Sequence, residues 1–493
     1  MAVVIAVDAG TTGVRAFALR EDGTPAGISY RELTQHFPRP GWVEHDAAEI
    51  WTAVRATLAE LTGAIDEPIA AIGITDQRET LVAWDRRTGQ PLHRAIVWQD
   101  RRTAARCEAL REEGAEPEIR AATGLVLDPY FTATKAEWLL TEGGLDAGPD
   151  LALGTVDAWV LWNLTGGPAG GTFATEPSNA SRTMLFDIRS LEWSPALLER
   201  FGVPAGSLPE VRPSSGRFGR TADGVGCPAG LPVSGMAGDQ QAALFGQACL
   251  EPGMTKNTYG TGSFVLMHVG ATCPPPVEGL LTTVAWALSD GTHAYALEGA
   301  IFVTGAAVQW LRDGLGVIER ADEMAELAAS VDDSDGCMLV PAFTGLGSPW
   351  WDPYARGTIV GITRGTTRAH LARAVLDAIS LQTLDVVDAM SEASGYRVPA
   401  LKADGGAAAN DVLLQIQADD LQVPVSRPVV HETTALGAAY LAGLAEGVWA
   451  STGDIVANWH LDATFRPSEG PELAAGRRAS WRRAVDRARR WVE

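Results

Sequence analysis

The sequence has few cysteines, and none of them is placed for pairing. An odd number of thiols without a CxxC motif argues against a disulfide framework and against a thiolate metal site. We therefore expect the cysteines to be reduced. The five residues are Cys107, Cys227, Cys249, Cys273 and Cys337.

Long apolar runs and positive charge are also scarce. No apolar run approaches the roughly 20 residues that a membrane-spanning helix needs, and the run Ala2–Val7 ends at Asp8, too early for a signal peptide. The net charge of −22 at pH 7 disfavours polyanionic partners. The sequence therefore predicts a cytoplasmic protein that binds neither nucleic acid nor membranes, with a substrate that is neutral or has its charge offset by Mg²⁺.

Two Gly-Thr loops are the most informative features that are present. They span Asp8–Gly13 (DAGTTG) and Tyr259–Ser263 (YGTGS). Strands are expected over 3–7 and 14–19 around the first loop, and over 264–269 after the second. Glycines let backbone N–H groups close on an anion, and threonine hydroxyls add further donors. The pair predicts two domains that hold the phosphates of one Mg-nucleotide.

The rest of the chain is typical of an α/β protein. A helix is expected over 47–61 with Asp46 as its cap, and a buried strand over 69–74. A second long helix is expected over 368–390. These alternating elements favour mixed sheets covered by helices.

Two large domains account for the length of the chain. With 493 residues, of which 46% are hydrophobic, each domain has enough sequence for a core of its own. A change of composition near Glu251 predicts domains over 1–250 and 251–493. The two similar loops also suggest a duplicated domain whose halves have diverged.

Asp239 is the first candidate for chemistry. It follows a predicted strand over 231–233 and precedes helical residues 242–245. One interpretation is a helix N-cap, a common role for aspartate. The other is a general base that takes the proton of an alcohol as its oxygen attacks the γ-phosphorus of ATP. Asp8, beside the first loop, would then bind Mg²⁺ through water.

Arg78 and Glu79 are candidates for substrate binding. They follow the strand predicted over 69–74. In open α/β sheets ligands bind beyond the strand ends, so the pair is placed to hold a substrate. The alternative is an ion pair on the surface.

Several segments carry a resemblance to a known family. They are PGWVEHDAAEIW (40–51), AAIGITDQRET (70–80), AIVWQDRR (95–102), TGLVLDPYF (123–131), NASRTMLF (179–186), GMAGDQQAALFGQ (235–247), KNTYGTGSF (256–264) and PAFTGLGSPWWDPYARG (341–357). With them the chain resembles, over essentially its whole length, the glycerol kinases of the FGGY family of carbohydrate kinases. The resemblance implies two actin-like (ribonuclease H-like) domains with mixed sheets, and a cleft between them for ATP and substrate.

The resemblance also implies an activity and a site. The expected activity is ATP-dependent phosphorylation of glycerol to sn-glycerol 3-phosphate, by a dimer or tetramer that uses ATP and Mg²⁺, with Asp239 as the base. The residues implied for the glycerol hydroxyls are Arg78, Glu79, Tyr130, Asp239 and Gln240, and those for its carbon chain are Trp98 and Phe264. Those implied for the nucleotide are Thr11, Thr12, Gly13, Arg15, Thr261, Gly305, Gln309, Gly406 and Asn410. The metal would be bound near Asp8 and Asp239.

The chain departs from the family pattern in the first loop. It reads DAGTTGVR where glycerol kinases commonly have DQGTTSSR, so Ala9, Gly13 and Val14 replace polar residues. One hydroxyl contact to phosphate is therefore missing. For Gln309 and Asn410 simpler interpretations also exist, a helix-surface residue and a helix cap.

Two other functions stay open at this point. One is a kinase of the same fold that acts on another polyol or on a pentulose such as xylulose. The other is a nucleotide-driven switch protein of the actin type that has no kinase activity.

Overall fold

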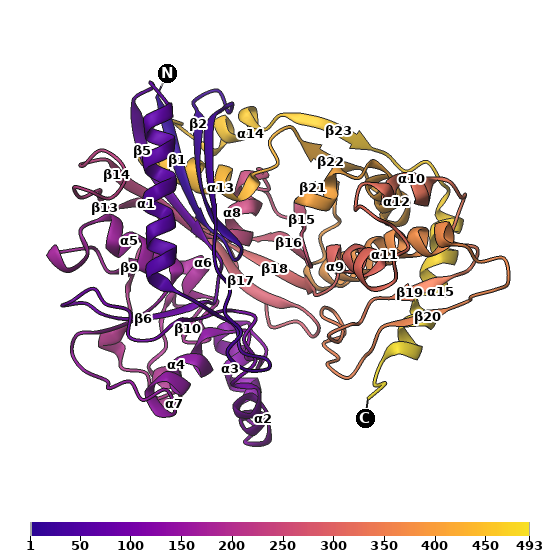
Figure 1. Ribbon diagram of the computed structural model, residues 1–493, viewed down its shortest axis with the longest axis horizontal. Coiled ribbons are helices and arrows are strands. Elements are labelled where there is room, and N and C mark those ends of the chain that lie inside the picture. Colours follow the sequence, from indigo (N-terminus) through magenta and orange to yellow (C-terminus); the bar gives the residue numbers. More distant parts are fainter. Residues whose placement is uncertain (1, 493) are drawn as a thin grey trace.

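Two large β-sheets organise the chain, whose computed structural model describes residues 2–492 (Figure 1). Across these residues the first sheet has the order β13-β14-β5-β1-β2-β3 and the second the order β17-β18-β16-β15-β21-β22-β23. The strands of the first sheet are β1 (Val3–Ala9), β2 (Gly13–Arg20), β3 (Pro25–Glu32), β5 (Ile69–Asp76), β13 (Ser215–Arg220) and β14 (Pro232–Gly238). Those of the second are β15 (Thr255–Tyr259), β16 (Ser263–Gly270), β17 (Leu281–Ala287), β18 (His293–Ile301), β21 (Leu401–Asp404), β22 (Val425–Pro428) and β23 (Leu461–Phe465).

The two sheets share one topology. In each, a central strand (β1 or β15) pairs antiparallel with its hairpin partner (β2 or β16) and parallel with a crossover strand (β5 or β21). A further antiparallel strand (β3 or β18) and a further parallel strand (β14 or β22) extend the two sides. The prediction of an α/β fold with mixed sheets is confirmed, and the shared order is what a duplicated domain would produce.

A smaller sheet and the helices complete the fold. Within residues 2–492 the smaller sheet has the order β4-β7-β6-β8, with β4 (Glu44–His45), β6 (Leu81–Asp85), β7 (Ala95–Ile96) and β8 (Leu151–Thr155). Short strands pair as β9 (Ala174–Thr175) with β12 (Glu210–Val211), β10 (Phe186–Asp187) with β11 (Glu192–Trp193), and β19 (Met338–Val340) with β20 (Thr358–Val360).

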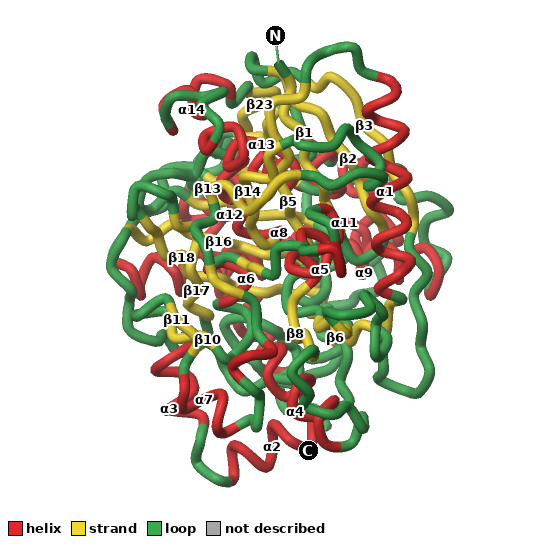
Figure 2. The backbone as a smooth tube through the Cα atoms, turned by 90° about the vertical axis from the view of Figure 1, so that its left-hand side faces the viewer, coloured by secondary structure: helices red, strands yellow, loops and turns green. Residues whose placement is uncertain are grey.

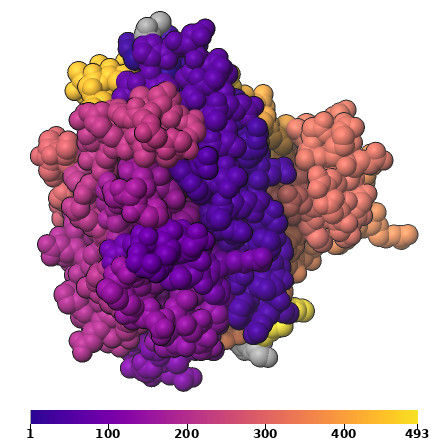
Figure 3. All heavy atoms as spheres, turned by 60° about the vertical axis from the view of Figure 1, so that its left-hand side comes forward, coloured from indigo at the N-terminus to yellow at the C-terminus, as the bar shows by residue number. Residues whose placement is uncertain are grey.

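The helices lie on both sides of the large sheets. Those of the first half are α1 (Ala47–Ala64), α2 (Ala104–Glu112), α3 (Glu116–Thr123), α4 (Thr132–Thr141), α5 (Val156–Leu164), α6 (Pro177–Ala180), α7 (Pro195–Arg200) and α8 (Asp239–Gly246). Those of the second half are α9 (Gly305–Gln309), α10 (Glu323–Ala329), α11 (Arg368–Ser394), α12 (Asp411–Leu421), α13 (Thr433–Ala445), α14 (Thr452–Asn458) and α15 (Pro471–Ala488). No helix within residues 2–492 combines the length and apolar character that a bilayer crossing requires. In Figure 3 part of the second half, coloured salmon, projects at the right of the body.

The first sheet is covered on both faces. Helix α1 runs along one side of the sheet, next to β2 and β3 (Figure 2). Ile5 and Val7 of β1 are buried in the core on that side, and Val4 and Ala6 are buried in the core shared with α13. Coverage on both faces explains why β1 is a continuous apolar run rather than an alternating one.

Side-chain caps mark the starts of α1 and α11, and the first was predicted. The Asp46 carboxylate accepts a hydrogen bond from the backbone N–H of Ala48 at 2.8 Å, at the start of α1. Thr367 caps α11 in a reciprocal arrangement with His370. Helix α11 then continues to Ser394, beyond the predicted end at 390, because the left-handed C-cap at Gly395 comes only there.

Helices α8 and α13 cross with their backbones in contact. A Cβ on Gly437 would overlap the carbonyl oxygen of Ala242, and one on Gly246 would overlap that of Thr433. Glycine at both points allows this approach. Although α13 comes late in the sequence, it packs on β1, β5 and β14 of the first sheet. The boundary between residues 250 and 251 stays a prediction, since segments from both sides of it share one core.

Replacing Gly437 by alanine should destabilise the protein. The added methyl group would overlap the backbone of α8, and such overpacking typically costs about 1–3 kcal/mol. Urea unfolding followed by circular dichroism measures the change. The matched control is Gly476→Ala in α15, where a Cβ meets no atom within 4 Å and where helix propensity predicts a gain of up to about 1 kcal/mol. Equal stability of the two variants would contradict the close crossing.

Candidate active site

The first Gly-Thr loop closes the hairpin between β1 and β2. The N–H of Gly10 donates to the carbonyl of Gly13 at 3.0 Å, so the chain turns tightly between the two strands. Asp8 and Arg15 face each other across the hairpin, with 3.6 Å between Arg15 Nη1 and Asp8 Oδ2. Thr12, at the tip, is exposed. The loop therefore presents a carboxylate, a guanidinium and a hydroxyl at one end of the sheet.

Trp98 is hydrogen-bonded to this loop. Its indole N–H donates to Thr11 Oγ1 at 2.9 Å, and its backbone N–H donates to Thr80 Oγ1 at 3.2 Å. The Thr80 hydroxyl donates to Gln77 Oε1 at 2.9 Å. The amide Nε2 of Gln77 donates in turn to the carbonyl of Gly10 at 3.0 Å. An indole N–H only donates, so Thr11 Oγ1 is the acceptor and the Thr11 O–H is left to donate to a ligand.

The second Gly-Thr loop is closed by the start of α9. The N–H of Gly260 donates to the carbonyl of Gly262 at 2.8 Å, and that of Gly305 donates to the carbonyl of Gly260 at 3.0 Å. A Cβ on Gly305 would lie 2.7 Å from the Gly260 oxygen, so this contact needs glycine. Thr261 is exposed at the tip, and Gln309 is exposed at the other end of α9.

A third glycine turn follows β21. Gly405 has a φ of 84°, and a Cβ there would lie 2.5 Å from the carbonyl oxygen of Tyr259. Gly406, in contrast, has open space where a side chain would be. Asn410 caps α12 by accepting a hydrogen bond from the N–H of Leu413 at 3.1 Å, so the interpretation as a helix cap holds for this side chain.

Asp239 is not the N-cap of its helix. Gly238 occupies the cap position, and Asp239 is the first residue of α8. Its Oδ1 accepts a hydrogen bond from the N–H of Gln240 at 2.7 Å and lies 3.1 Å from Arg78 Nε. Its Oδ2 receives no hydrogen bond from residues 2–492, and the side chain is 32% exposed. One oxygen is thus held in place while the other is available to a ligand.

Arg78 and Glu79 do not form a surface ion pair. Both are buried, with exposed fractions of 2% and 1%. Glu79 has a φ of 60°, a conformation that costs free energy in a residue other than glycine. The Thr132 hydroxyl donates to its carbonyl at 3.1 Å, and Arg182 Nε donates to its Oε1 at 2.6 Å. These contacts hold the Glu79 carboxylate in one orientation.

Glu298, on β18 of the second sheet, binds both arginines. Its two oxygens accept from Arg78 Nη1 at 2.5 Å and from Arg78 Nη2 at 3.0 Å. Arg182 Nη2 also donates to it, at 2.9 Å. Burial alone would raise the pKa of Glu298, but the charges of Arg182 and Arg78 outweigh it and lower the pKa to about 2. The carboxylate is therefore ionised and joins the two halves of the chain.

Two buried lysines position polar groups of the site. Lys256 Nζ donates to Gln240 Oε1 at 2.5 Å, so the Gln240 NH₂ group is left to donate elsewhere. Lys135 Nζ donates to the carbonyls of Tyr130 at 2.7 Å and Glu79 at 3.4 Å. Burial lowers the pKa of Lys256 to about 8 and that of Lys135 to about 7.

Sequence reasoning did not assign roles to these partners. Arg182 and Lys256 lie in segments that carried the family resemblance, but neither was identified as part of the site. Glu298 is a lone acid inside the apolar strand sequence YALEGAI. That pattern is the one available signal, since an acid in a buried strand needs a cationic partner.

Three aromatic rings meet beside Asp239 and Arg78. The ring centres of Trp98 and Tyr130 are 5.6 Å apart, and those of Trp98 and Phe264 are 6.4 Å apart, both edge to face. The guanidinium carbon of Arg78 lies 5.7 Å from the Phe264 ring centre. The residues implied for the carbon chain of glycerol are thus brought together from both halves.

Asp8 and Asp239 fit a divalent cation. Burial raises the pKa of Asp8 to about 6; Arg15 opposes this shift, and the negative charge of Asp239 adds to it. The two carboxylates are close enough to repel each other, so a cation between them would be favoured. Within residues 2–492 no three His, Cys, Asp or Glu side chains form a metal site. Two carboxylates with water and phosphate oxygens are a usual donor set for Mg²⁺.

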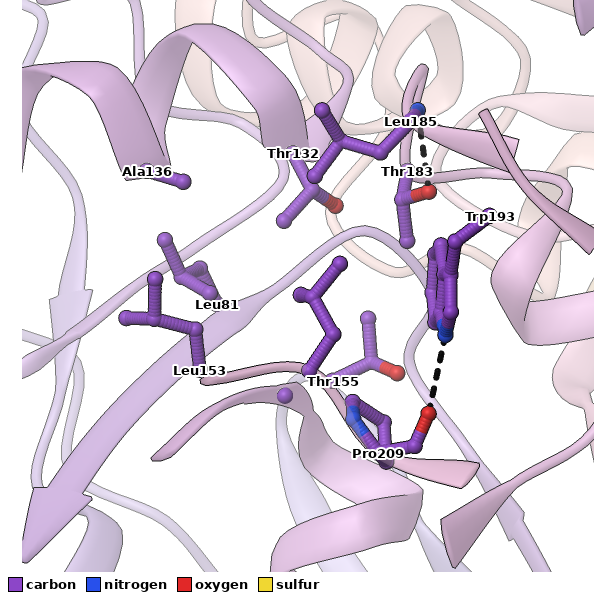
Figure 4. Close-up of a pocket in the computed structure, with 11 residues that line it drawn as sticks. Leu81, Thr132, Ala136, Leu153, Thr155, Thr183, Leu185, Trp193 and Pro209 are labelled. Atoms are coloured by element: carbon purple, nitrogen blue, oxygen red, sulfur yellow. Dashed lines mark hydrogen bonds between the residues drawn. The ribbon is translucent and has the colours of Figure 1, made fainter. Parts of the chain in front are cut away.

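A small cavity is lined by none of the residues proposed for the site (Figure 4). Its volume is about 10 Å³, the size of one water. The Thr132 hydroxyl, on its wall, holds the carbonyl of Glu79, and Trp193 Nε1 donates to the carbonyl of Pro209 at 2.9 Å. The lining residues are Leu81, Thr132, Ala136, Leu153, Gly154, Thr155, Thr183, Leu185, Trp193, Leu208 and Pro209.

Known proteins resemble the chain over its whole length. The model of the N-terminal domain of the FGGY family of carbohydrate kinases matches residues 3–246, and that of the C-terminal domain matches 255–465. A glycerol kinase of Carboxydothermus hydrogenoformans is 52% identical over 99% of this chain and 98% of the relative. One of Deinococcus radiodurans is 52% identical with the same two coverages.

Solved structures resemble the fold as well. Plasmodium falciparum glycerol kinase with ADP has a TM-score of 0.92 and 32% identity, over 99% of this chain and 98% of that one. Xylulose kinase from Rhodospirillum rubrum has a TM-score of 0.86 and 26% identity, over 98% of both chains.

Removing the charge of Glu298 should destabilise the protein in a pH-dependent way. Glu298→Gln removes the carboxylate that the two buried guanidiniums share, at a cost of about 3–5 kcal/mol at pH 7. Arg182 then keeps its ion pair with Glu79, and Arg78 keeps those with Asp239 and Glu79. Because the pKa of Glu298 is lowered from 4.5 to about 2, the carboxylate stabilises the fold above pH 4.5 and loses this effect as the pH falls towards 2. Urea unfolding of both proteins from pH 7 to pH 3 measures the difference, which should shrink below pH 4.5.

The control for this variant is Glu108→Gln. Glu108 pairs with Arg111 on the surface, where its side chain is 65% exposed, so its loss should change stability far less. A difference for Glu298→Gln that is absent, or that stays constant with pH, would contradict the role of the carboxylate.

Proposed function

The chain belongs to the FGGY family of carbohydrate kinases, and we propose that it is a glycerol kinase that transfers the γ-phosphoryl group of ATP to a terminal hydroxyl of glycerol. The observation that carries the proposal is the Asp239 carboxylate, held by one oxygen beside Arg78 and open at the other. The 52% identity to glycerol kinases over 99% of the chain supports the choice of substrate.

The polar groups match a short triol. Glu79 and Asp239 accept hydrogen bonds, and the free NH₂ group of Gln240 donates one. Trp98 and Phe264 cover the carbon chain, which leaves little room for a longer sugar. A site built for hydroxyls rejects analogues that lack them, because its buried polar groups are then left without partners.

Asp239 starts the reaction by taking a proton. The terminal hydroxyl of glycerol gives its proton to Asp239 Oδ2, and its oxygen attacks the γ-phosphorus in line as the bond to the β-phosphate oxygen breaks. Sn-glycerol 3-phosphate and ADP are the products. Mg²⁺ held near Asp8 and Asp239 would offset negative charge on the phosphates.

The Gly-Thr loops hold the nucleotide from two sides. Backbone N–H groups and the hydroxyls of Thr11, Thr12 and Thr261 donate to phosphate oxygens, and Arg15 adds a positive charge. The remaining residues proposed for the nucleotide are Gly13, Gly305, Gln309, Gly406 and Asn410. A dimeric or tetrameric state and a cytoplasmic location stay predictions.

Substrate preference separates the proposal from the alternatives. We expect ADP formation to depend on glycerol, and to be much slower with erythritol or xylulose, because the rings of Trp98 and Phe264 limit the site. A coupled assay with glycerol, dihydroxyacetone, erythritol, xylulose and no acceptor measures this. Preference for xylulose would favour a pentulose kinase. ATP turnover that no polyol changes would indicate a nucleotide switch.

Asp239→Asn should slow phosphoryl transfer while keeping the fold. Loss of general-base catalysis typically lowers the rate by about 10²–10⁴, whereas glycerol affinity should weaken less because Arg78 and Gln240 remain. Steady-state kcat and glycerol KM measure the two effects separately. Asp146→Asn, at an exposed position, is the control and should match the wild type. Near-normal kcat for Asp239→Asn would refute the role of this residue.

A further inference from the structure

Tyr30 lies beside the first Gly-Thr loop, on the strand next to it. Asp8, Arg15 and Tyr30 are directly opposite one another on β1, β2 and β3. Side chains directly opposite on adjacent antiparallel strands lie on the same face of a sheet. The guanidinium carbon of Arg15 lies 5.7 Å from the Tyr30 ring centre, in agreement with this register. Tyr30 is therefore on the face that carries the residues proposed for metal and phosphate.

The Tyr30 hydroxyl reaches the loop itself. Its Oη lies 3.3 Å from the carbonyl oxygen of Thr12. It also fills the space next to Gly13, since a Cβ on Gly13 would lie 2.5 Å from Tyr30 Cζ and would overlap its hydroxyl. A Cβ there would also lie 2.5 Å from the carbonyl oxygen of Arg31, so the close approach of β3 needs glycine. The loop thus has a phenol where its own residue has no side chain.

The hydroxyl is free to change its acceptor. A distance of 3.3 Å is long for an O–H···O hydrogen bond, which is usually about 2.7–2.8 Å. Tyr30 is also 41% exposed. Bonds to a charged phosphate oxygen are roughly twice as strong as bonds to a neutral carbonyl. Exchanging the Thr12 carbonyl for a phosphate oxygen is therefore favourable.

We propose that the Tyr30 hydroxyl donates to a phosphate oxygen of the bound nucleotide and so supplies a donor that glycine at position 13 cannot. The inference rests on the proposed function in so far as the ligand is Mg-ATP. Tyr30 also lies under the guanidinium of Arg15, so its ring helps to orient that guanidinium.

Tyr30→Phe separates the hydroxyl from the ring. It keeps the contact with Arg15 and removes only the donor. The loss of one hydrogen bond predicts about 2- to 10-fold weaker binding of the non-hydrolysable ATP analogue AMP-PNP with Mg²⁺. Binding of adenosine, which has no phosphate, and the KM for glycerol should not change. Tyr30→Ala removes the ring as well and should weaken AMP-PNP binding further. Titration calorimetry and steady-state kinetics measure these quantities.

The controls make the outcome decisive. Tyr354→Phe, at an exposed tyrosine of the second half, should bind AMP-PNP as the wild type does. Unchanged AMP-PNP affinity of Tyr30→Phe, or an equal loss for adenosine, would overturn the inference. Glycerol-dependent turnover of the wild type is measured alongside. If the wild type shows none, the proposed function fails, whereas active wild type with an unaffected Tyr30→Phe refutes only the role of Tyr30.

Discussion

The polar part of the site depends on the hydrogen bonds that the Glu298 carboxylate accepts from Arg78 and Arg182. Burying two guanidiniums costs several kcal/mol each unless carboxylates offset their charge, and Glu298 is the carboxylate that accepts hydrogen bonds from both. Arg78 Nε in turn lies 3.1 Å from Asp239 Oδ1, so one guanidinium joins the acid on β18 to the proposed base. Because Glu298 comes from the second sheet, the site is complete only when the two halves are assembled.

Helix α8 connects this chemistry with the architecture. It begins at Asp239, and its far end is held where Gln247 donates to Asp404 Oδ2 at 2.6 Å. Thr433, at the start of α13, donates to the same oxygen at 2.7 Å. At Gly437 and Gly246 the backbones of α13 and α8 meet without intervening side chains. Helix α8 also contacts β14 of the first sheet and β15 and β16 of the second, so the helix that carries the proposed base lies between the two sheets.

Local signals in the sequence were sufficient for the elements around the site. The hairpin at Asp8–Gly13, the Asp46 cap and the strand before Asp239 depend on neighbouring residues, and each was predicted. The packing of α13 on the first sheet and the pairing of Arg78 with Glu298 depend on contacts between residues far apart in the chain, which no local pattern encodes. The N-cap interpretation of Asp239 was wrong because Gly238, with its extended backbone, occupies that position.

Trp98 joins the part of the site proposed for the acceptor to the loop proposed for the phosphates. Sequence comparison assigned it only to the carbon chain of glycerol, yet its indole N–H holds Thr11 and its backbone is connected through Thr80 and Gln77 to Gly10. Under the proposed function a polyol packed on this ring would restrain the indole, and through it the Thr11 hydroxyl. One hydrogen bond contributes about 1 kcal/mol, enough for a coupling of about 5-fold between acceptor and nucleotide. The wall proposed for the acceptor and the loop proposed for the phosphates are therefore joined by a hydrogen bond that the resemblance did not imply, and under the proposed function this bond would link acceptor binding to donor alignment.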